Sequence, residues 1–232
     1  DGFTPRSITY TTIRYDERPY CGLLFLSHGL TSINAKKKLL LYTQLDLGVM
    51  GYITGGEAEQ KAIHKAINGD QPLGWENQIK TDAAINYRAK LEKGILVTKH
   101  LEFMLNSTAR VGSLYTDIGV GAHARVGVFN SYFANLGLQK HTVKNKFKIY
   151  LTTKLNTTLV GYNATMQGGL FNSKSILEVP TTNINRNVHA AYLGITVGYK
   201  RFSLEYNRTF ITPEFKGGLY HGWGGLTINV CF

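Results

Sequence analysis

The sequence of 232 residues contains little proline and little cysteine, with 5 and 2 residues. The two cysteines, Cys21 and Cys231, stand far apart, which excludes a cysteine metal motif and leaves open whether they pair. No apolar run approaches the roughly 20 residues that a membrane helix requires. No basic segment followed by an apolar one opens the chain, so any secretory signal has been cleaved or is not included.

Acidic residues are also scarce, because 15 Asp and Glu stand against 26 Lys and Arg. The formal net charge of +11 predicts an anionic partner. Nucleic acid, anionic lipid and lipopolysaccharide phosphate all qualify, and charge alone does not choose among them. The chain lacks aromatic and basic residues interleaved on one strand face, as stacking on nucleic acid requires, so we expect no nucleic-acid partner.

Tyrosine and glycine are abundant, with 14 and 25 residues, which together with few prolines favours an all-β protein with many turns. Alternating apolar and polar residues support this reading, since alternation places the two kinds on opposite faces of a strand. The pattern predicts about nine strands, near residues 18–31, 38–51, 81–93, 99–113, 115–129, 145–162, 187–199, 201–212 and 219–232.

Two classes of protein show such alternation: a soluble sandwich or barrel, and a transmembrane barrel with apolar residues outside and a polar lumen. Several segments alternate over about 10 residues, the length of a tilted membrane strand. The polar faces mix glycine with charge, as at Gly121, His123 and Arg125, which suits a narrow lumen. We therefore predict a single transmembrane antiparallel β-barrel over residues 1–232. Tyr52, Tyr115, Tyr132, Tyr162 and Trp223 would form its aromatic girdles, and the terminal Phe232 resembles the assembly signal of outer-membrane barrels.

The segment from Gly55 to Ile79 differs, because its spacing is helical. One face collects small and apolar residues, Ala58, Ala62, Ile63, Ala66 and Ile67, and we expect it to pack on the barrel. Gly56 is the expected N-cap, and Asn68-Gly69 and Pro72 the stop. His64 falls on the polar side. Residues 52–80 thus form a predicted helix-bearing extracellular loop.

Two stretches resemble one known family. Residues 3–26 contain FTPRSI and DERPYCGLLFL, and residues 58–79 read AEQKAIHKAINGDQPLGWENQI. Both are similar to motifs of the outer-membrane lipid A 3′-O-deacylases, the LpxR-like proteins, and a weaker likeness continues to Phe232. The motifs are fairly specific as a pair.

The resemblance implies a twelve-stranded barrel in the outer membrane of a Gram-negative bacterium. Its active site would lie between the barrel wall and a loop helix, facing the cell exterior. The implied activity is Ca²⁺-dependent hydrolysis of the 3′-linked acyloxyacyl ester of lipid A, a lipopolysaccharide modification. His64 corresponds to the catalytic base and Asp70 to a supporting acid. The partners expected are lipid A and outer-membrane lipids, and the expected state is a monomer.

Four further residues are candidates for binding substrate: Arg18, Lys61, Lys65 and Trp75. The basic ones suit lipid phosphates. Trp75 could contact an acyl chain, although packing of the loop is the simpler role. For Arg18, fixing the entry to a strand is likewise the simpler role, and phosphate contact the lesser one. From spacing alone, a histidine on a polar helix face is usually only solvated, so the catalytic role of His64 rests on the resemblance.

One departure from the family concerns an Asn-Asp pair on its first strand and a Ser or Thr on its second, which help to form the calcium and catalytic site. No equivalent occurs here, and the metal ligands are therefore unknown. We expect these strands to precede Asp1, since three more would bring nine to twelve. The alternative function is a non-enzymatic barrel, a passive channel or an adhesin. Bulky lumen candidates, Tyr42, Arg88, Arg125 and Tyr150, argue for a filled interior instead.

Overall fold

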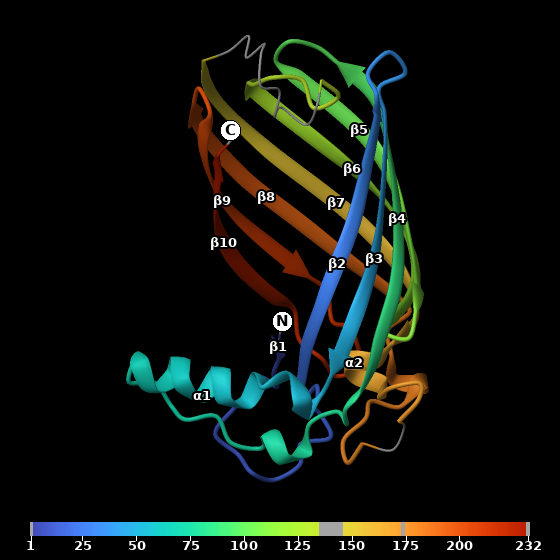
Figure 1. The fold of residues 1–232 in the computed structure, drawn as a ribbon, viewed down its shortest axis with the longest axis vertical. Helices are drawn as coiled ribbons and strands as arrows, with labels where there is room; N and C mark the ends of the chain where they lie inside the picture. The colour runs from blue at the N-terminus through green and yellow to red at the C-terminus, as the bar shows by residue number, and fades with distance from the viewer. Residues whose placement is uncertain (1, 135–145, 173–174, 231–232) are drawn as a thin grey trace.

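The computed structural model describes residues 2–134, 146–172 and 175–230. Ten strands form one curled antiparallel sheet in which each strand pairs with its neighbours in the sequence (Figure 1). The strands are β1 (Gly2–Phe3), β2 (Cys21–Asn34), β3 (Leu39–Met50), β4 (Asp82–Val97), β5 (Leu101–Gly112), β6 (Tyr115–Val128), β7 (Phe147–Asn163), β8 (Asn187–Tyr199), β9 (Phe202–Ile211) and β10 (His221–Val230). The helices are α1 (Gly56–Ala66), α2 (Ala164–Gln167) and the short η1 (Tyr52–Thr54), η2 (Trp75–Asn77) and η3 (Thr181–Asn183).

The nine strands predicted from alternation are confirmed as β2 to β10, with ends that differ by a few residues. The two-residue β1 was not predicted, because two residues show no alternation. Within the described residues β1 and β10 are the edge strands of the sheet. Cys231 and Phe232 lie outside the described residues, and Cys21 is a buried thiol at the start of β2.

The two faces of the sheet confirm the arrangement predicted for a membrane barrel. Outward side chains are apolar and exposed, with Leu26 at 84% and Leu155 at 62% of full exposure. Inward side chains are polar and covered, with Asn86 at 2% and Glu92 at 1%. A soluble β-protein shows the opposite pattern, so this chain places its apolar face where lipid can cover it.

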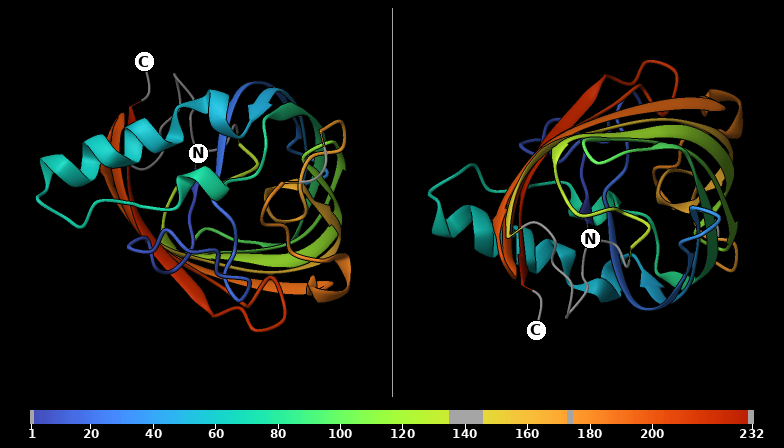
Figure 2. Two further views of the ribbon diagram at one scale, coloured as in Figure 1. Left: turned by 90° about the horizontal axis from the view of Figure 1, so that it is seen from below. Right: turned by 90° about the horizontal axis from the view of Figure 1, so that it is seen from above.

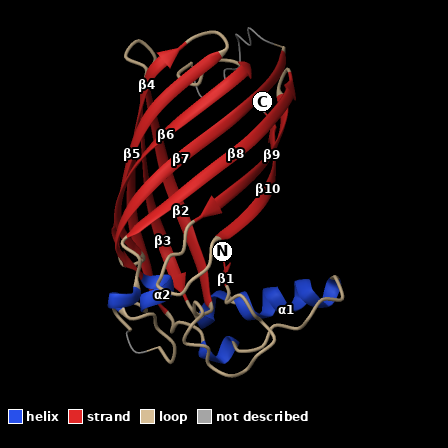
Figure 3. Ribbon diagram, turned by 180° about the vertical axis from the view of Figure 1, so that it is seen from behind, coloured by secondary structure: helices blue, strands red, loops and turns tan. Residues whose placement is uncertain are grey.

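The long connections gather at one end of the sheet, here called the helix end. Residues 51–81 join β3 to β4 there, and the β7–β8 and β9–β10 connections lie beside them (Figure 3). Seen along the strands, α1 reaches sideways past the wall formed by β9 and β10 (Figure 2). None of the described helices is long and apolar enough to cross a membrane.

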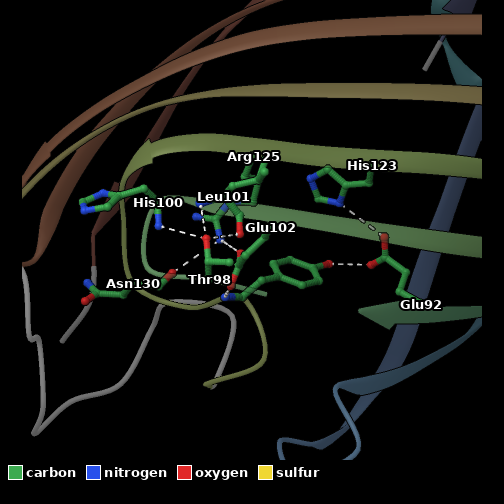
Figure 4. A network of polar contacts seen from close by, with 9 residues as sticks. Glu92, Thr98, His100, Leu101, Glu102, His123, Arg125 and Asn130 are labelled. Carbon is green, nitrogen blue, oxygen red and sulfur yellow. Dashed lines mark hydrogen bonds and ion pairs between the residues drawn. The ribbon is translucent and has the colours of Figure 1, made fainter. Parts of the chain in front are cut away.

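At the opposite end a buried polar network joins the wall to the start of the β6–β7 connection (Figure 4). The Arg125 guanidinium lies 2.8 Å from the Glu102 carboxylate, and the Tyr132 hydroxyl donates to Glu92 at 2.6 Å. Tyr132 is therefore turned inward, and its predicted place in an outer aromatic girdle was wrong. A buried carboxylate accepts its hydroxyl inside the sheet, whereas a girdle position offers a tyrosine only headgroups and water.

The interior is filled by side chains as predicted. Arg125 lies over the rings of Phe129 at 4.6 Å and Tyr150 at 4.4 Å. A polar cavity of about 540 Å³ remains, lined among others by Tyr42 and Arg88. The inward residues thus occupy much of the space that a passive channel would leave open.

Candidate functional site

The helix-bearing loop is clamped to the sheet at both of its ends. Gly51 has φ of 86° and its N–H donates to the Gly22 carbonyl at 2.8 Å. A Cβ on Gly22 would overlap Thr54 Oγ1, so only glycine allows η1 to approach β2 this closely. At the other end Ile79, fully buried, donates its N–H to the Tyr20 carbonyl at 2.9 Å. The predicted loop therefore leaves and rejoins the wall beside one segment, residues 20–22.

The helix α1 forms where the sequence predicted it. Glu57 lies in its first turn and Lys65 in its last, so both charges suit the helix dipole. The predicted stop at Asn68-Gly69 is confirmed, because Asn68 has φ of 52° and the Gly69 N–H donates to the His64 carbonyl at 2.8 Å. The N-cap is Gly55, one residue before the glycine predicted.

The packing of α1 differs from the prediction. The apolar face was expected against the barrel, yet Ile63 is 52% and Ile67 is 68% exposed. The contact with the wall comes instead from the first turns of the helix. A Cβ on Gly56 would lie 3.0 Å from the Trp75 ring, and Gln60 accepts a hydrogen bond of 2.7 Å from Trp75 Nε1. The helix is held at its beginning and projects, so its last turns have nothing in the described chain to pack on.

Of the two roles considered for Trp75, the structure shows packing of the loop, because the side chain is buried and not open to an acyl chain. Its side chain is 2% exposed, and its ring centroid lies 4.6 Å from that of Tyr20. The Tyr20 hydroxyl donates to the Leu73 carbonyl at 2.9 Å, and burial raises the pKa of this phenol to about 12. The Tyr20–Trp75 pair thus joins the DERPY segment to the loop, which physically connects the two motifs of the sequence.

His64 contacts the chain just after its own helix. Its Nδ1 lies 2.6 Å from the backbone carbonyl oxygen of Asp70. The group in contact is the main-chain carbonyl of Asp70, whereas the carboxylate of this predicted supporting acid makes no such contact with the ring. A carbonyl oxygen only accepts hydrogen bonds, so Nδ1 carries the proton and the neutral ring presents Nε2 as an acceptor.

Arg18 lies apart from α1, on the inner side of the helix end. Its guanidinium pairs with Glu214 at 2.9 Å and donates to Thr165 Oγ1 at 3.0 Å. It also covers the Phe3 ring at 4.2 Å. These contacts tie the N-terminal segment to the β7–β8 and β9–β10 connections, so the strand-entry role predicted as the simpler one agrees with the structure.

The two lysines of α1 lie on the open surface. Lys61 pairs with Glu57 at 2.6 Å, one helical turn away, and Lys65 is exposed. An exposed pair of this kind contributes about 0.3–0.5 kcal/mol, so an anion could replace Glu57 at little cost. Of the six predicted site residues, the structure brings together His64 and Asp70, with Lys61 and Lys65 on the same helix. Trp75 supports the loop, and Arg18 lies apart from it.

Two supporting residues were not predicted, Gln60 and Tyr20. Both act through Trp75, and no local pattern relates a residue of the helix to an indole 15 positions later.

Among the residues the structure describes, no group of three or more His, Cys, Asp and Glu side chains is close enough to hold a metal ion. The described side chains therefore do not by themselves fit the implied Ca²⁺.

Comparison with known proteins decides the family. A family model described as outer membrane protein LpxR matches residues 1–232. The chain belongs to the LpxR family. This is the family of lipid A 3′-O-deacylases, hydrolases of the outer membrane, that the two motifs predicted.

A solved structure of this family shares the fold. It is described as LpxR from Salmonella typhimurium and is 22% identical, with a TM-score of 0.83. The match covers all of this chain and 81% of that chain. The search of curated proteins gave no match. At this identity the likeness to the Salmonella LpxR extends to the fold, and the chemistry of the present chain must be argued from its own residues.

Proposed function

We propose that this LpxR-family chain hydrolyses the 3′-linked acyloxyacyl ester of lipid A, with His64 as the general base and the helix end facing the cell exterior. The observation that carries the proposal is the hydrogen bond of 2.6 Å between His64 Nδ1 and the Asp70 carbonyl. It orients the ring and leaves Nε2 free to accept a proton. Imidazole suits this role because it changes its charge near neutral pH.

In the proposed reaction His64 Nε2 takes a proton from a water molecule as the water oxygen bonds to the ester carbonyl carbon. The tetrahedral adduct then collapses, the bond from carbon to the sugar oxygen breaks, and the imidazolium returns its proton to that oxygen. The products are a free acid and a sugar hydroxyl. The Asp70 carbonyl keeps its hydrogen bond to Nδ1 throughout, which holds the ring in one orientation.

The substrate is an anionic lipid, and the exposed part of α1 suits it. Lys61 and Lys65 place two cations near His64 in the helix, where they would meet lipid phosphates as point charges. Ile63 and Ile67 add exposed apolar surface for acyl chains. We propose that Trp75 influences the substrate only through the position of the loop, and that Arg18 contributes only by holding the N-terminal segment against Glu214 and Thr165.

Calcium would stabilise the negative charge on the carbonyl oxygen when it is bound. Because the described side chains form no metal cluster, no step above depends on it. We expect deacylation by membranes that contain the complete protein to stop in excess EGTA and to resume when Ca²⁺, but not Mg²⁺, is restored. Unchanged activity in EGTA would contradict the calcium requirement.

Mass spectrometry of lipid A tests the proposed activity itself. Cells that express the complete gene should contain lipid A that lacks the 3′ acyloxyacyl group, whereas cells with the empty vector retain it. If both samples keep the full set of acyl chains while the protein is folded in the membrane, the proposed function fails. A non-enzymatic barrel would then be the better interpretation.

The role of Asp70 gives a sharper test of the site. Because the main-chain carbonyl makes the contact, Asp70→Asn and Asp70→Ala should change the rate of deacylation by no more than about twofold, the scale of ordinary surface substitutions. The rate is measured on purified lipid A. A hundredfold loss in both variants would instead assign a direct role to the carboxylate.

A further inference from the structure

Four uncharged polar side chains converge inside the sheet over two glycines of β6. They line the cavity of about 540 Å³ and are Asn106, Thr108, Asn156 and Thr158. A Cβ on Gly119 would lie 2.7 Å from Thr108 Oγ1 on β5 and 3.3 Å from Thr158 Oγ1 on β7, so both hydroxyls lean over this glycine. Gly121 stands in register between the two asparagines. None of the four side chains forms a hydrogen bond within the described residues, so their polar groups are open to the cavity.

The charged side chains that line the same cavity do not balance. Three are basic and two are acidic: Arg88, Lys90, Arg110, Glu92 and Asp117. Each carboxylate already has a basic partner, because Asp117 accepts from Arg110 Nε at 3.0 Å and Glu92 lies 3.1 Å from Lys90. Arg88 is half-buried, and no described residue forms a salt bridge or a hydrogen bond with its guanidinium. The lining therefore carries one positive charge in excess.

The neighbours of Arg88 on the sheet do not neutralise its charge. It stands in register between Gln44 on β3 and Arg110 on β5, and like charges directly opposite each other destabilise a sheet. Asp46 comes one inward position nearer the helix end, but its carboxylate accepts from Ser27 Oγ at 2.5 Å and pairs with no described cation. A partly covered charge without a partner costs free energy, which a bound anion would offset.

An oxyanion fits these groups. The planar guanidinium presents paired N–H donors that match two oxygens of one anion. Thr108 lies within reach of Arg88, because it stands two residues from Arg110 on the neighbouring strand, a diagonal of roughly 7–8 Å between Cα atoms. Thr158 approaches the same point from the other side. Donors from several directions suit a tetrahedral phosphate better than a flat carboxylate.

The position of the cavity indicates where the anion comes from. Its lining residues point to the interior of the sheet, whereas lipid can cover only the apolar outward face. The anion is therefore a dissolved one and not the headgroup of a membrane lipid.

We propose that the interior cavity is a binding site for a small dissolved oxyanion of the phosphate type. Arg88 makes a two-point contact with the anion, and the hydroxyls of Thr108 and Thr158 donate to it above Gly119. The anion supplies the negative charge that the lining lacks. The site lies inside the sheet, apart from His64, so it goes beyond the proposed deacylase reaction and does not depend on it.

Isothermal titration calorimetry of the complete protein, folded in maltoside micelles, tests the site with inorganic phosphate as the probe. Sodium chloride holds the ionic strength constant, so that general screening is equal at every point. We expect saturable binding of phosphate. Arg88→Gln should weaken it by at least about tenfold, because hydrogen bonds to a charged group are lost. Thr108→Val, which keeps the shape and removes the hydroxyl, should weaken it by about two- to tenfold.

Arg201→Gln is the matched control, because it removes the same charge from an exposed turn between β8 and β9. It should bind phosphate like the unsubstituted protein. Arg88→Lys keeps the charge but not the planar fork, so its affinity should lie between those of the unsubstituted protein and Arg88→Gln. Migration of unboiled protein on gels checks the fold of each variant.

Three results would overturn the proposal. The first is equal phosphate affinity in Arg88→Gln and Arg201→Gln, and the second is the lack of saturable binding by the unsubstituted protein. The third is competition by dioleoyl phosphatidic acid in the micelles, which would assign the contact to a lipid headgroup. The readout involves no turnover, so failure here leaves the deacylase proposal intact.

Discussion

Replacement of His64 by alanine should lower kcat for deacylation by about 10²–10⁴-fold and change KM little. The imidazole is proposed to act on the attacking water, which matters in the transition state, whereas lipid A is held by other groups. Activity is measured by mass spectrometry of lipid A incubated with purified protein in detergent. The loss should appear in kcat because the group removed takes no part in binding the substrate in its ground state.

Two further variants separate chemistry from structure in this experiment. His64→Gln retains an N–H that can donate to the Asp70 carbonyl but lacks a basic nitrogen, so it should be as inactive as His64→Ala. His28→Ala is the control, since His28 is an exposed histidine on β2, away from α1. Retention of more than about a tenth of the rate in both His64 variants would mean that another group is the base.

Replacement of Glu102 by alanine should destabilise the folded barrel by about 3–5 kcal/mol. Glu102 is fully buried, and its carboxylate accepts from Arg125 at 2.8 Å and from the Tyr132 N–H at 3.0 Å (Figure 4). Removing it leaves Arg125, a residue that is only 7% exposed, without its counter-ion. The free energy of unfolding is measured by urea titration in detergent micelles with tryptophan fluorescence.

A double variant tests whether the unpaired charge causes the loss. Glu102→Ala combined with Arg125→Met should be less destabilised than the sum of the two single variants, because no charge is then left buried alone. The exposed pair Arg14–Asp16, at 3.1 Å, is the control, and Asp16→Ala should leave the unfolding midpoint unchanged. If the losses of unfolding free energy in the two single variants add up in the double variant, side-chain packing and not charge pairing holds the start of the β6–β7 connection in the interior.

The strands were predictable from the sequence because the cause of a strand pattern is local. A side chain two residues along returns to the same face, so the outward side chains of β7, such as Ile149, Leu151 and Leu155, can be recognised without knowing their neighbours. The outward position of the apolar faces and the inward position of the polar faces were predictable for the same reason. The stop of α1 at Asn68-Gly69 depends on the same few residues that the sequence displays.

The candidate site was predictable only in part. The motif around His64 located the proposed base, and its contact with residue 70 follows from the short turn between them. Which group of Asp70 makes the contact depends on how the backbone turns after the helix, and the sequence does not display that. The exposure of Ile63 and Ile67 was mispredicted, because amphipathic spacing indicates a face suited to burial but not the surface that buries it.

The sequence by itself determined the strand faces, the helix and its ends, the family and the position of the proposed base. Only the tertiary structure decided that Trp75 is held by Gln60 and Tyr20 and that Tyr132 turns inward to Glu92. The physical reason is distance along the chain. Periodicity and capping act over a few residues, whereas these contacts join segments that only the curl of the sheet brings together.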